Sequence, residues 1–161
     1  RYGQFIYMTG LLPLRSVITV SKARNIKLPG LPVTIKKNSL MVIPTIASLW
    51  NQNEMCQRYG VNQLYTSDDY SNGLFPQLND EQVFDLAIQK DSKLKEPFFL
   101  MVLTMSMHQP YTKQVDSSFL IDDPSMSRDL ACYLNMCHYT DSQIKRYFEH
   151  LKRNGLFDIF L

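Results

Sequence analysis

The stretch FFLMVLTMSMHQPY (Phe98–Tyr111) begins with the longest apolar run in the chain and carries a histidine near its end. The run is apolar at odd and even positions alike, which predicts a strand over Phe98–Met105 in the centre of a sheet covered by helices on both faces. In open α/β sheets, ligands bind beyond the carboxyl ends of the strands. His108 lies there, so it is a candidate ligand-binding residue; the alternative is a turn histidine that bonds a backbone carbonyl.

A long helix is predicted after this strand, over Met126–Asn154. Apolar residues recur at steps of three and four along it, Ser127 can cap its start, and Gly155 suits its end. The sequence LFDIFL (156–161) then opens a further apolar strand. A strand, a crossover helix and a second strand form a βαβ unit, which predicts an α/β fold of the three-layer α/β/α type. Because the second strand stops at Leu161, we expect the domain to be present only in part.

The rest of the chain gives weaker patterns. They predict a short strand over Gln4–Met8, a helix over Leu14–Ala23, an exposed loop over Asn25–Ser39, helices over Ile43–Trp50 and Asn51–Tyr59, and a helix capped by Asn79.

Composition sets limits on function. The chain has 161 residues, 45% hydrophobic and 20% charged, with a net charge of +2, which suits a globular domain and gives no argument for nucleic acid binding. Its three cysteines show no metal-ligand spacing and are interpreted as free thiols.

Asp141 falls on the apolar stripe of the long helix. A carboxylate there needs partners, so Asp141 is interpreted as a buried structural acid rather than a catalytic one.

Three segments together resemble a known family. They are EPFFLMVLTMSMHQPY (96–111), YLNMCHYTDSQIKRYFEHLKRNGLFD (133–158) and WNQNEMCQRYG (50–60). Their order and spacing resemble the lipoteichoic acid synthase branch of the sulfatase and alkaline phosphatase superfamily. The resemblance is good over 50–161 and faint over 1–49. It implies that residues 1–161 are the central portion of one sulfatase-like domain with an alkaline phosphatase-type sandwich.

The resemblance also implies roles for single residues. His108 matches a histidine that contacts the phosphoryl or sulfuryl oxygens of the substrate, and Trp50 and Asn51 match a tryptophan–asparagine pair at the substrate site. Gln52 falls where the synthases carry a substrate-binding arginine. A neutral amide cannot make a bidentate charged contact with an oxyanion, which argues against glycerol phosphate polymerisation by this chain. Asp141 matches an acid that is structural in the family.

The chemistry implied by the resemblance is metal-assisted transfer. A threonine or modified residue attacks phosphorus or sulfur, and a divalent cation (Mn, Mg, Zn or Ca) holds the oxygen. Aligning the family motif with TGLLPLRSV (9–17) puts Pro13 at the nucleophile and Leu14 at the acid, and neither can serve; Thr9 is nearby in the wrong register. The metal-binding Asp-His pair would follow Leu161, and another acid would precede Arg1. We therefore expect no metal to bind to these residues alone.

Two functions stay open at this point. One is part of a membrane-anchored or periplasmic enzyme at the extracytoplasmic face of the cell envelope. This enzyme would act on phosphate or sulfate esters that are lipid-linked or part of a glycan. A segment outside these 161 residues would anchor it to the membrane, and the 161 residues alone would be inactive. The other is a non-catalytic pseudoenzyme or binding module that keeps only the pocket around His108 and Trp50. The chain itself is a fragment, a degenerate relative, or the joined ordered pieces of a longer protein.

Overall fold

A computed structural model describes residues 2–13, 26, 28–35, 38–91, 98–111 and 123–156. The elements in these ranges, in chain order, are helix α1 (Tyr2–Thr9), helix α3 (Leu31–Ile35), strand β1 (Asn38–Val42), 3-10 turn η2 (Leu49–Asn51), helix α4 (Gln52–Tyr59), strand β2 (Gln63–Tyr65), 3-10 turns η3 (Ser67–Asp69) and η4 (Ser71–Gly73), helix α5 (Asp80–Asp91), strand β3 (Phe98–Val102) and helix α6 (Arg128–Arg153).

The described strands form one parallel sheet in the order β2-β1-β3. Met41 lies opposite Leu64 on one side and Met101 on the other. Because all three strands run the same way, their carboxyl ends meet at one edge of the sheet. This edge is where the loops after β1 and β3 leave the sheet.

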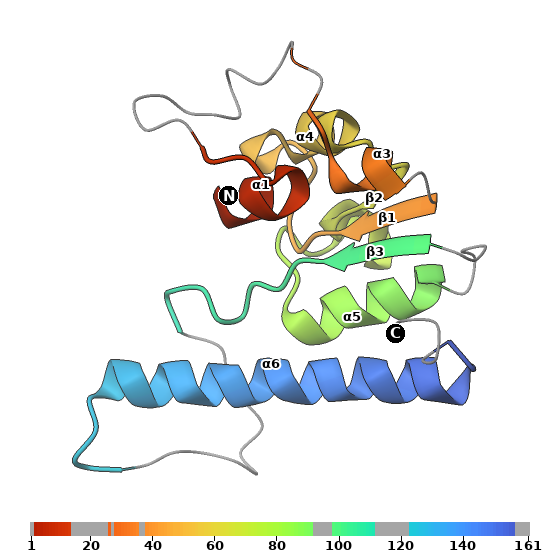
Figure 1. Cartoon of the computed structure of the whole chain (residues 1–161). Helices are drawn as coiled ribbons and strands as arrows, with labels where there is room; N and C mark the ends of the chain where they lie inside the picture. Colours follow the sequence, from red (N-terminus) through yellow and green to blue (C-terminus); the bar gives the residue numbers. More distant parts are fainter. Residues whose placement is uncertain are drawn as a thin grey trace.

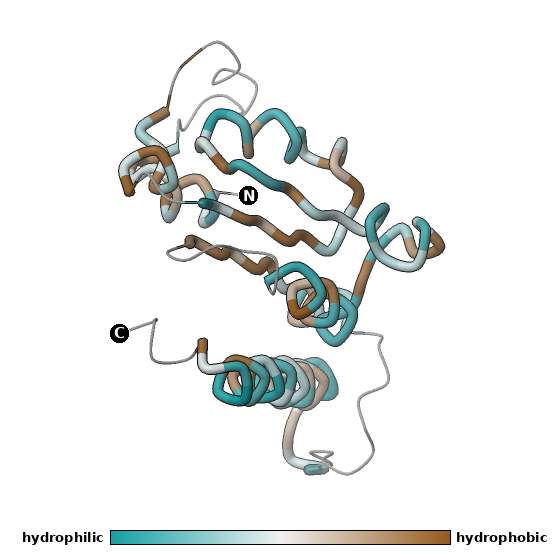
Figure 2. The backbone as a smooth tube through the Cα atoms, turned by 90° about the vertical axis from the view of Figure 1, so that its right-hand side faces the viewer, coloured by the Kyte–Doolittle hydropathy of each residue, from teal (hydrophilic) through white to brown (hydrophobic). Residues whose placement is uncertain are grey.

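Helices cover both faces of the sheet (Figure 1). Helices α1, α3 and α4 lie on one side, and α5 and then α6 lie on the other. Alternate residues of β1 divide between the two: Leu40 and Val42 join the cluster with α5 and α6, whereas Met41, like Ile43 just after the strand, packs toward α4. The prediction of an α/β/α arrangement is confirmed. The position of the sheet between two helix layers explains the unbroken apolar sequence of β3, whereas β1 and β2 begin with polar residues (Figure 2).

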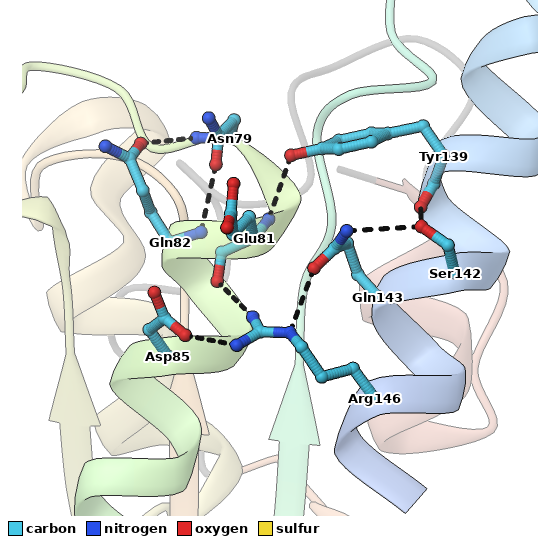
Figure 3. A network of polar contacts seen from close by, with 8 residues as sticks. All are labelled: Asn79, Glu81, Gln82, Asp85, Tyr139, Ser142, Gln143 and Arg146. Atoms are coloured by element: carbon cyan, nitrogen blue, oxygen red, sulfur yellow. Dashed lines mark hydrogen bonds and ion pairs between the residues drawn. The ribbon is translucent and has the colours of Figure 1, made fainter. Parts of the chain in front are cut away.

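Helix α6 packs on α5 through a polar network as well as apolar contacts (Figure 3). The guanidinium of Arg146 pairs with the Asp85 carboxylate and donates from Nη2 to the Glu81 carbonyl at 2.9 Å. The Tyr139 hydroxyl accepts from the backbone N–H of Glu81 at 3.3 Å. These contacts join the middle of α6 to the first two turns of α5.

Several predicted elements are confirmed. Helix α4 ends at Gly60, whose φ of 78° is left-handed, as expected for a terminating glycine. Asn79 caps α5, because its Oδ1 accepts from the N–H of Gln82 at 2.9 Å. Ser127 caps α6 through its Oγ.

Other predictions are wrong. Gln4–Met8 is helical, Asn25–Ser39 contains α3 and the start of β1, and the predicted helix over Ile43–Trp50 is a loop ending in η2. β-Branched and apolar residues in short runs do not separate strand from helix by periodicity, so packing decides. β3 also ends at Val102, earlier than Met105. Among the described strands it pairs with β1, and its predicted central position is not tested by these strands. The predicted helix over Leu14–Ala23 and the strand over 157–161 lie outside the described residues.

Within the ranges that the structure describes, no helix combines the length and apolarity that crossing a bilayer requires.

Candidate functional site

Two adjoining cavities lie at the carboxyl ends of β1 and β3. The first, of about 390 Å³, is lined by Gln4, Ile43, Pro44, Thr45, Trp50, Gln52, Leu103, Thr104, Met105 and His108. The second, of about 430 Å³, is lined by Thr45, Leu49, Trp50, Gln77, Met105, Ser106, His108, Pro110 and Met136. Four residues line both: Thr45, Trp50, Met105 and His108. The structure therefore brings together Trp50 and His108, which the sequence analysis singled out from segments far apart in the chain.

Trp50 is held between the cavities by an unusual backbone. Its φ is 56° and that of Asn51 is 55°, so two consecutive non-glycine residues are left-handed. A bulky residue in this region stores strain of about 1–3 kcal/mol. Leu49 and Trp50 are both more than a third exposed, so the indole is available to a ligand. Strain of this kind at an exposed aromatic residue is typical of a binding site.

Gln52 closes one side of the first cavity in partnership with Gln4 of α1. Each side-chain amide donates to the oxygen of the other at 3.0 Å. Gln52 is buried, so this reciprocal pair fixes where its amide lies. Gln4 donates its other N–H to the Met41 sulfur at 3.7 Å, whereas the Gln52 amide keeps one further N–H for a ligand. Gln52 thus offers a neutral, fixed donor at the position where the resemblance implies an arginine.

His108 is exposed and carried by the turn after β3. Its backbone N–H donates to the Met105 carbonyl at 2.9 Å, and its ring Nδ1 lies 2.6 Å from the Gln109 carbonyl oxygen. A carbonyl only accepts, so Nδ1 carries the hydrogen of this bond. Nε2 then accepts from a ligand hydroxyl when the ring is neutral and donates to an oxyanion when it is protonated. The His108 ring therefore bonds a backbone carbonyl, as expected for a turn histidine, and it also lines both cavities.

The turn that carries His108 is fastened by Asp80, a residue that the sequence analysis did not single out. Asp80 is fully buried. Its Oδ1 accepts from the backbone N–H groups of Met105 at 2.8 Å and Ser106 at 2.9 Å, and its Oδ2 accepts from Thr140 Oγ1 at 2.6 Å. The sequence does contain one signal: an acid directly after a capping asparagine. That signal does not show that the carboxylate turns inward.

The remaining candidates lie elsewhere. Asn51 does not line either cavity and borders a separate polar hollow with Asn53 and Glu54. Asp141 is exposed, so its predicted burial is wrong: the buried face of α6 passes through Thr140 and Tyr147 instead. The spacing of the apolar residues of α6 had predicted a different buried face. Phe148, an apolar residue of this helix, is 48% exposed.

The segment aligned with the family nucleophile offers no reactive hydroxyl in the described part of the chain. Thr9 is buried, donates from Oγ1 to the Phe5 carbonyl at 2.7 Å and accepts from the N–H of Leu11. Its hydroxyl is therefore part of the end of α1. Pro13 follows in the coil after that helix, and Leu14 lies outside the described residues.

Neutral groups dominate the two cavities. His108 is the one titratable side chain among the described residues that line them. In the same part of the chain, no three His, Cys, Asp or Glu side chains converge as metal ligands would. The described residues thus do not fit a divalent cation; they fit a ligand recognised by hydroxyl, amide, indole and imidazole groups.

A cysteine lies behind the first cavity. Cys56 of α4 is buried beside Met41, with 3.3 Å between the two sulfur atoms, and burial raises the pKa of its thiol to about 12. A thiol that stays protonated is a poor nucleophile. Cys56 is therefore a packing residue, as predicted for a free buried thiol.

The chain is thus an α/β/α domain with two adjoining cavities at the carboxyl ends of parallel strands. A solved structure from Vibrio parahaemolyticus, described as a protein in the alkaline phosphatase superfamily, covers 95% of this chain with a TM-score of 0.72 and 23% identity. The lipoteichoic acid synthase LtaP from Listeria monocytogenes covers 98% with a TM-score of 0.83 and 17% identity. The alkaline phosphatase-type fold is thereby confirmed.

The particular family follows from the sequence comparison. The family model described as Sulfatase matches residues 5–161, and the chain belongs to this family. Lipoteichoic acid synthase 2 from Bacillus subtilis (strain 168) is 29% identical over 165 residues, which cover 97% of this chain and 25% of that protein. The resemblance to the lipoteichoic acid synthase branch is confirmed, and the chain spans about a quarter of the length of that relative.

Proposed function

We propose that this chain forms the substrate-binding side of a phosphate ester site in a sulfatase-family protein of the phosphoglycerol transferase type. One observation carries the proposal: Trp50, Gln52 and His108, each matched by the family resemblance, line one cavity at the carboxyl ends of β1 and β3. A related fold adds support. The phosphoglycerol transferase GacH from Streptococcus pyogenes, solved in complex with sn-glycerol-1-phosphate, covers 87% of this chain with a TM-score of 0.61.

The arrangement recognises an ester through neutral donors. The second N–H of the Gln52 amide and the hydroxyl groups of Thr45 and Thr104 border the first cavity. Each can donate to a phosphoryl oxygen, and His108 Nε2 can meet a phosphate oxygen or a glycerol hydroxyl. None of these neutral donors makes the bidentate contact from a fixed positive charge that an arginine makes with an oxyanion. The site therefore favours weak, reversible binding over the tight hold that an arginine gives.

The whole protein is proposed to act at the extracytoplasmic face of the cell envelope, anchored through a segment outside this chain. Its ester would be lipid-linked or part of a glycan, and the divalent metal and the nucleophile would come from residues other than those described. No catalytic step is assigned to the cavities themselves. On this proposal the 161 residues alone bind an ester but do not turn it over.

Titration with glycerol phosphate tests the binding. Trp50, the one tryptophan of the chain, provides a fluorescence signal at the site. His108→Ala should weaken binding by about tenfold, the effect of losing one good hydrogen bond to a charged ligand. His138→Ala is the matched control, because His138 is exposed on α6 and lines neither cavity. Equal affinities for wild type and His108→Ala would reject the site.

A second variant tests the role of position 52. Gln52→Arg places a guanidinium where the resemblance implies one and can still donate to Gln4 Oε1. A charge-assisted contact should tighten glycerol phosphate binding by about tenfold. If Gln52→Arg leaves affinity unchanged while the protein stays folded, a phosphate does not occupy the first cavity.

The second candidate function is a non-catalytic binding module. The neutral lining of both cavities favours it, because His108 is the one titratable side chain among the described residues there and no three His, Cys, Asp or Glu side chains of the described residues converge as metal ligands would. Turnover of an aryl phosphate or aryl sulfate with Mn²⁺ by the full-length protein supports the enzyme. Ester binding without turnover by the full-length protein supports the module.

A further inference from the structure

We propose that Asp80 is a positioning residue for His108. Its buried carboxylate sets the conformation of the turn over residues 103–108 and thereby turns the imidazole toward the two cavities. The binding readout below rests on the proposed function, whereas the exchange readout does not.

Asp80 joins three elements that are distant in the sequence. It is the first residue of α5, its Oδ1 binds two backbone N–H groups after β3, and its Oδ2 binds Thr140 in the middle of α6. Its own backbone N–H donates to Ser106 Oγ at 3.1 Å. Four hydrogen bonds thus hold a buried acid between two helices and one turn, and two of them restrain Ser106 from both its backbone and its side chain.

The restrained residues are neighbours of the site. Met105 and Ser106 line the second cavity together with His108, and the His108 N–H donates to the Met105 carbonyl. The ring of His108 bonds the carbonyl of the adjacent Gln109. Because that partner belongs to the same turn, the ring follows wherever the backbone of the turn goes. The bonds from Asp80 to Met105 and Ser106 are therefore the described contacts that tie this turn to the helices beneath it.

Substitutions separate positioning from general stability. Asp80→Asn keeps an oxygen for the two N–H groups and offers an NH₂ that can donate to Thr140 Oγ1, so it should preserve the turn. Asp80→Ala leaves both N–H groups without their acceptor. Asp91→Ala is the matched control: Asp91 is also buried and on α5, but it binds the side chains of Tyr147 and His150, away from the cavities.

The experiment combines glycerol phosphate titration with amide hydrogen exchange on the same variants of the protein. We expect Asp80→Ala to weaken binding by at least about tenfold and to speed exchange at Met105 and Ser106. Asp80→Asn should stay within about threefold of wild type in affinity, and so should Asp91→Ala despite its lower stability. Binding and exchange in Asp80→Ala that match those in Asp91→Ala would overturn the positioning role.

The test also covers two other outcomes: an Asp80→Ala variant that does not fold, and a wild type that does not bind glycerol phosphate. If Asp80→Ala does not fold, Thr140→Val removes only the hydroxyl bound to Oδ2, and Tyr147→Phe removes the corresponding hydroxyl at Asp91. Faster exchange at Ser106 in Thr140→Val but not in Tyr147→Phe supports the proposal, and equal exchange refutes it. If wild type does not bind glycerol phosphate, the proposed function fails, and the exchange comparison still decides the role of Asp80.

Discussion

The two ends of α5 each bury a carboxylate, and the two carboxylates have different kinds of partner. At the first residue, Asp80 accepts from backbone N–H groups of the turn after β3. At the last residue, Asp91 accepts from the Tyr147 hydroxyl at 3.1 Å and lies within 3.3 Å of His150 Nε2. Both ends pack against α6, but only the first is next to the two cavities.

The difference shows how one helix can serve stability and a site at once. A side-chain hydroxyl or imidazole that loses its partner can rotate toward water, whereas a backbone N–H in a packed turn cannot. A buried acid that binds backbone therefore dictates conformation, and one that binds side chains mainly adds stability. We expect four tests to sharpen or break this comparison.

The largest loss of stability is expected from a substitution in the middle of α5, between its two buried acids. Leu86 is fully buried in the core beneath the sheet. Leu86→Ala should lower the free energy of unfolding by about 3 kcal/mol, because it leaves a cavity under the middle of α5. Urea unfolding measures it, and Gln89→Ala on the exposed face of α5 should change little. A cost below 1 kcal/mol would show that α5 is not part of a shared core.

The next effect compares the two acids directly. Asp80→Ala should cost about 3 kcal/mol and Asp91→Ala about 2 kcal/mol, because the first leaves two backbone N–H groups unsatisfied. Urea midpoints and slopes of both variants measure this difference. The reverse order would contradict the distinction between backbone and side-chain partners.

The third effect depends on pH and concerns the Asp91 end. Burial first, and then the nearby Asp91 carboxylate, raise the pKa of Tyr147 above its ordinary value. The folded state therefore keeps the phenol protonated while the unfolded state loses its proton above roughly pH 10. Stability is fully present below that pH and should fall as pH rises, with a contribution from Tyr147 of up to about 1.4 kcal/mol per unit. Tyr147→Phe should unfold with a shallower alkaline dependence, and an unchanged slope would exclude Tyr147 as its source.

The smallest loss of stability is expected at the ion pair of Arg146 with Asp85, which lies between Asp80 and Asp91 on α5. Arg146 and Asp85 are each about a third exposed, so Arg146→Met should cost less than about 1 kcal/mol. Thermal unfolding at low and high salt measures it, with Lys145→Met on the exposed side of α6 as the control. Weaker glycerol phosphate binding in Arg146→Met would show that this contact also reaches the site.

The sequence predicted the layered fold and the edge of the sheet where the two cavities lie. It did so because a parallel strand between two helix layers has an unbroken apolar run, as at Phe98–Val102, and because His108 comes soon after that run. Caps such as Asn79 and Ser127 were also predictable, since they act within one turn of the chain.

What the sequence did not predict depends on contacts between distant segments. The inward turn of Asp80 needs Ser106 and Thr140, which come from two other elements. The burial of Asp141 was mispredicted because α6 presents its middle to α5 through Thr140 and polar groups, so its apolar residues did not mark the buried face. Helix periodicity alone carries no information on which neighbour a face will meet.

The left-handed pair at Trp50 and Asn51 has a consequence for any attempt to thermostabilise this protein. Glycine adopts such angles without strain, so substitutions toward glycine at these two positions are those that a selection for heat resistance would enrich. The same substitutions would remove the indole at position 50, or give the peptide at position 51 more freedom than asparagine allows. Variants chosen for melting temperature alone should therefore accumulate changes at the cavity wall, and a binding screen run in parallel is needed to retain it.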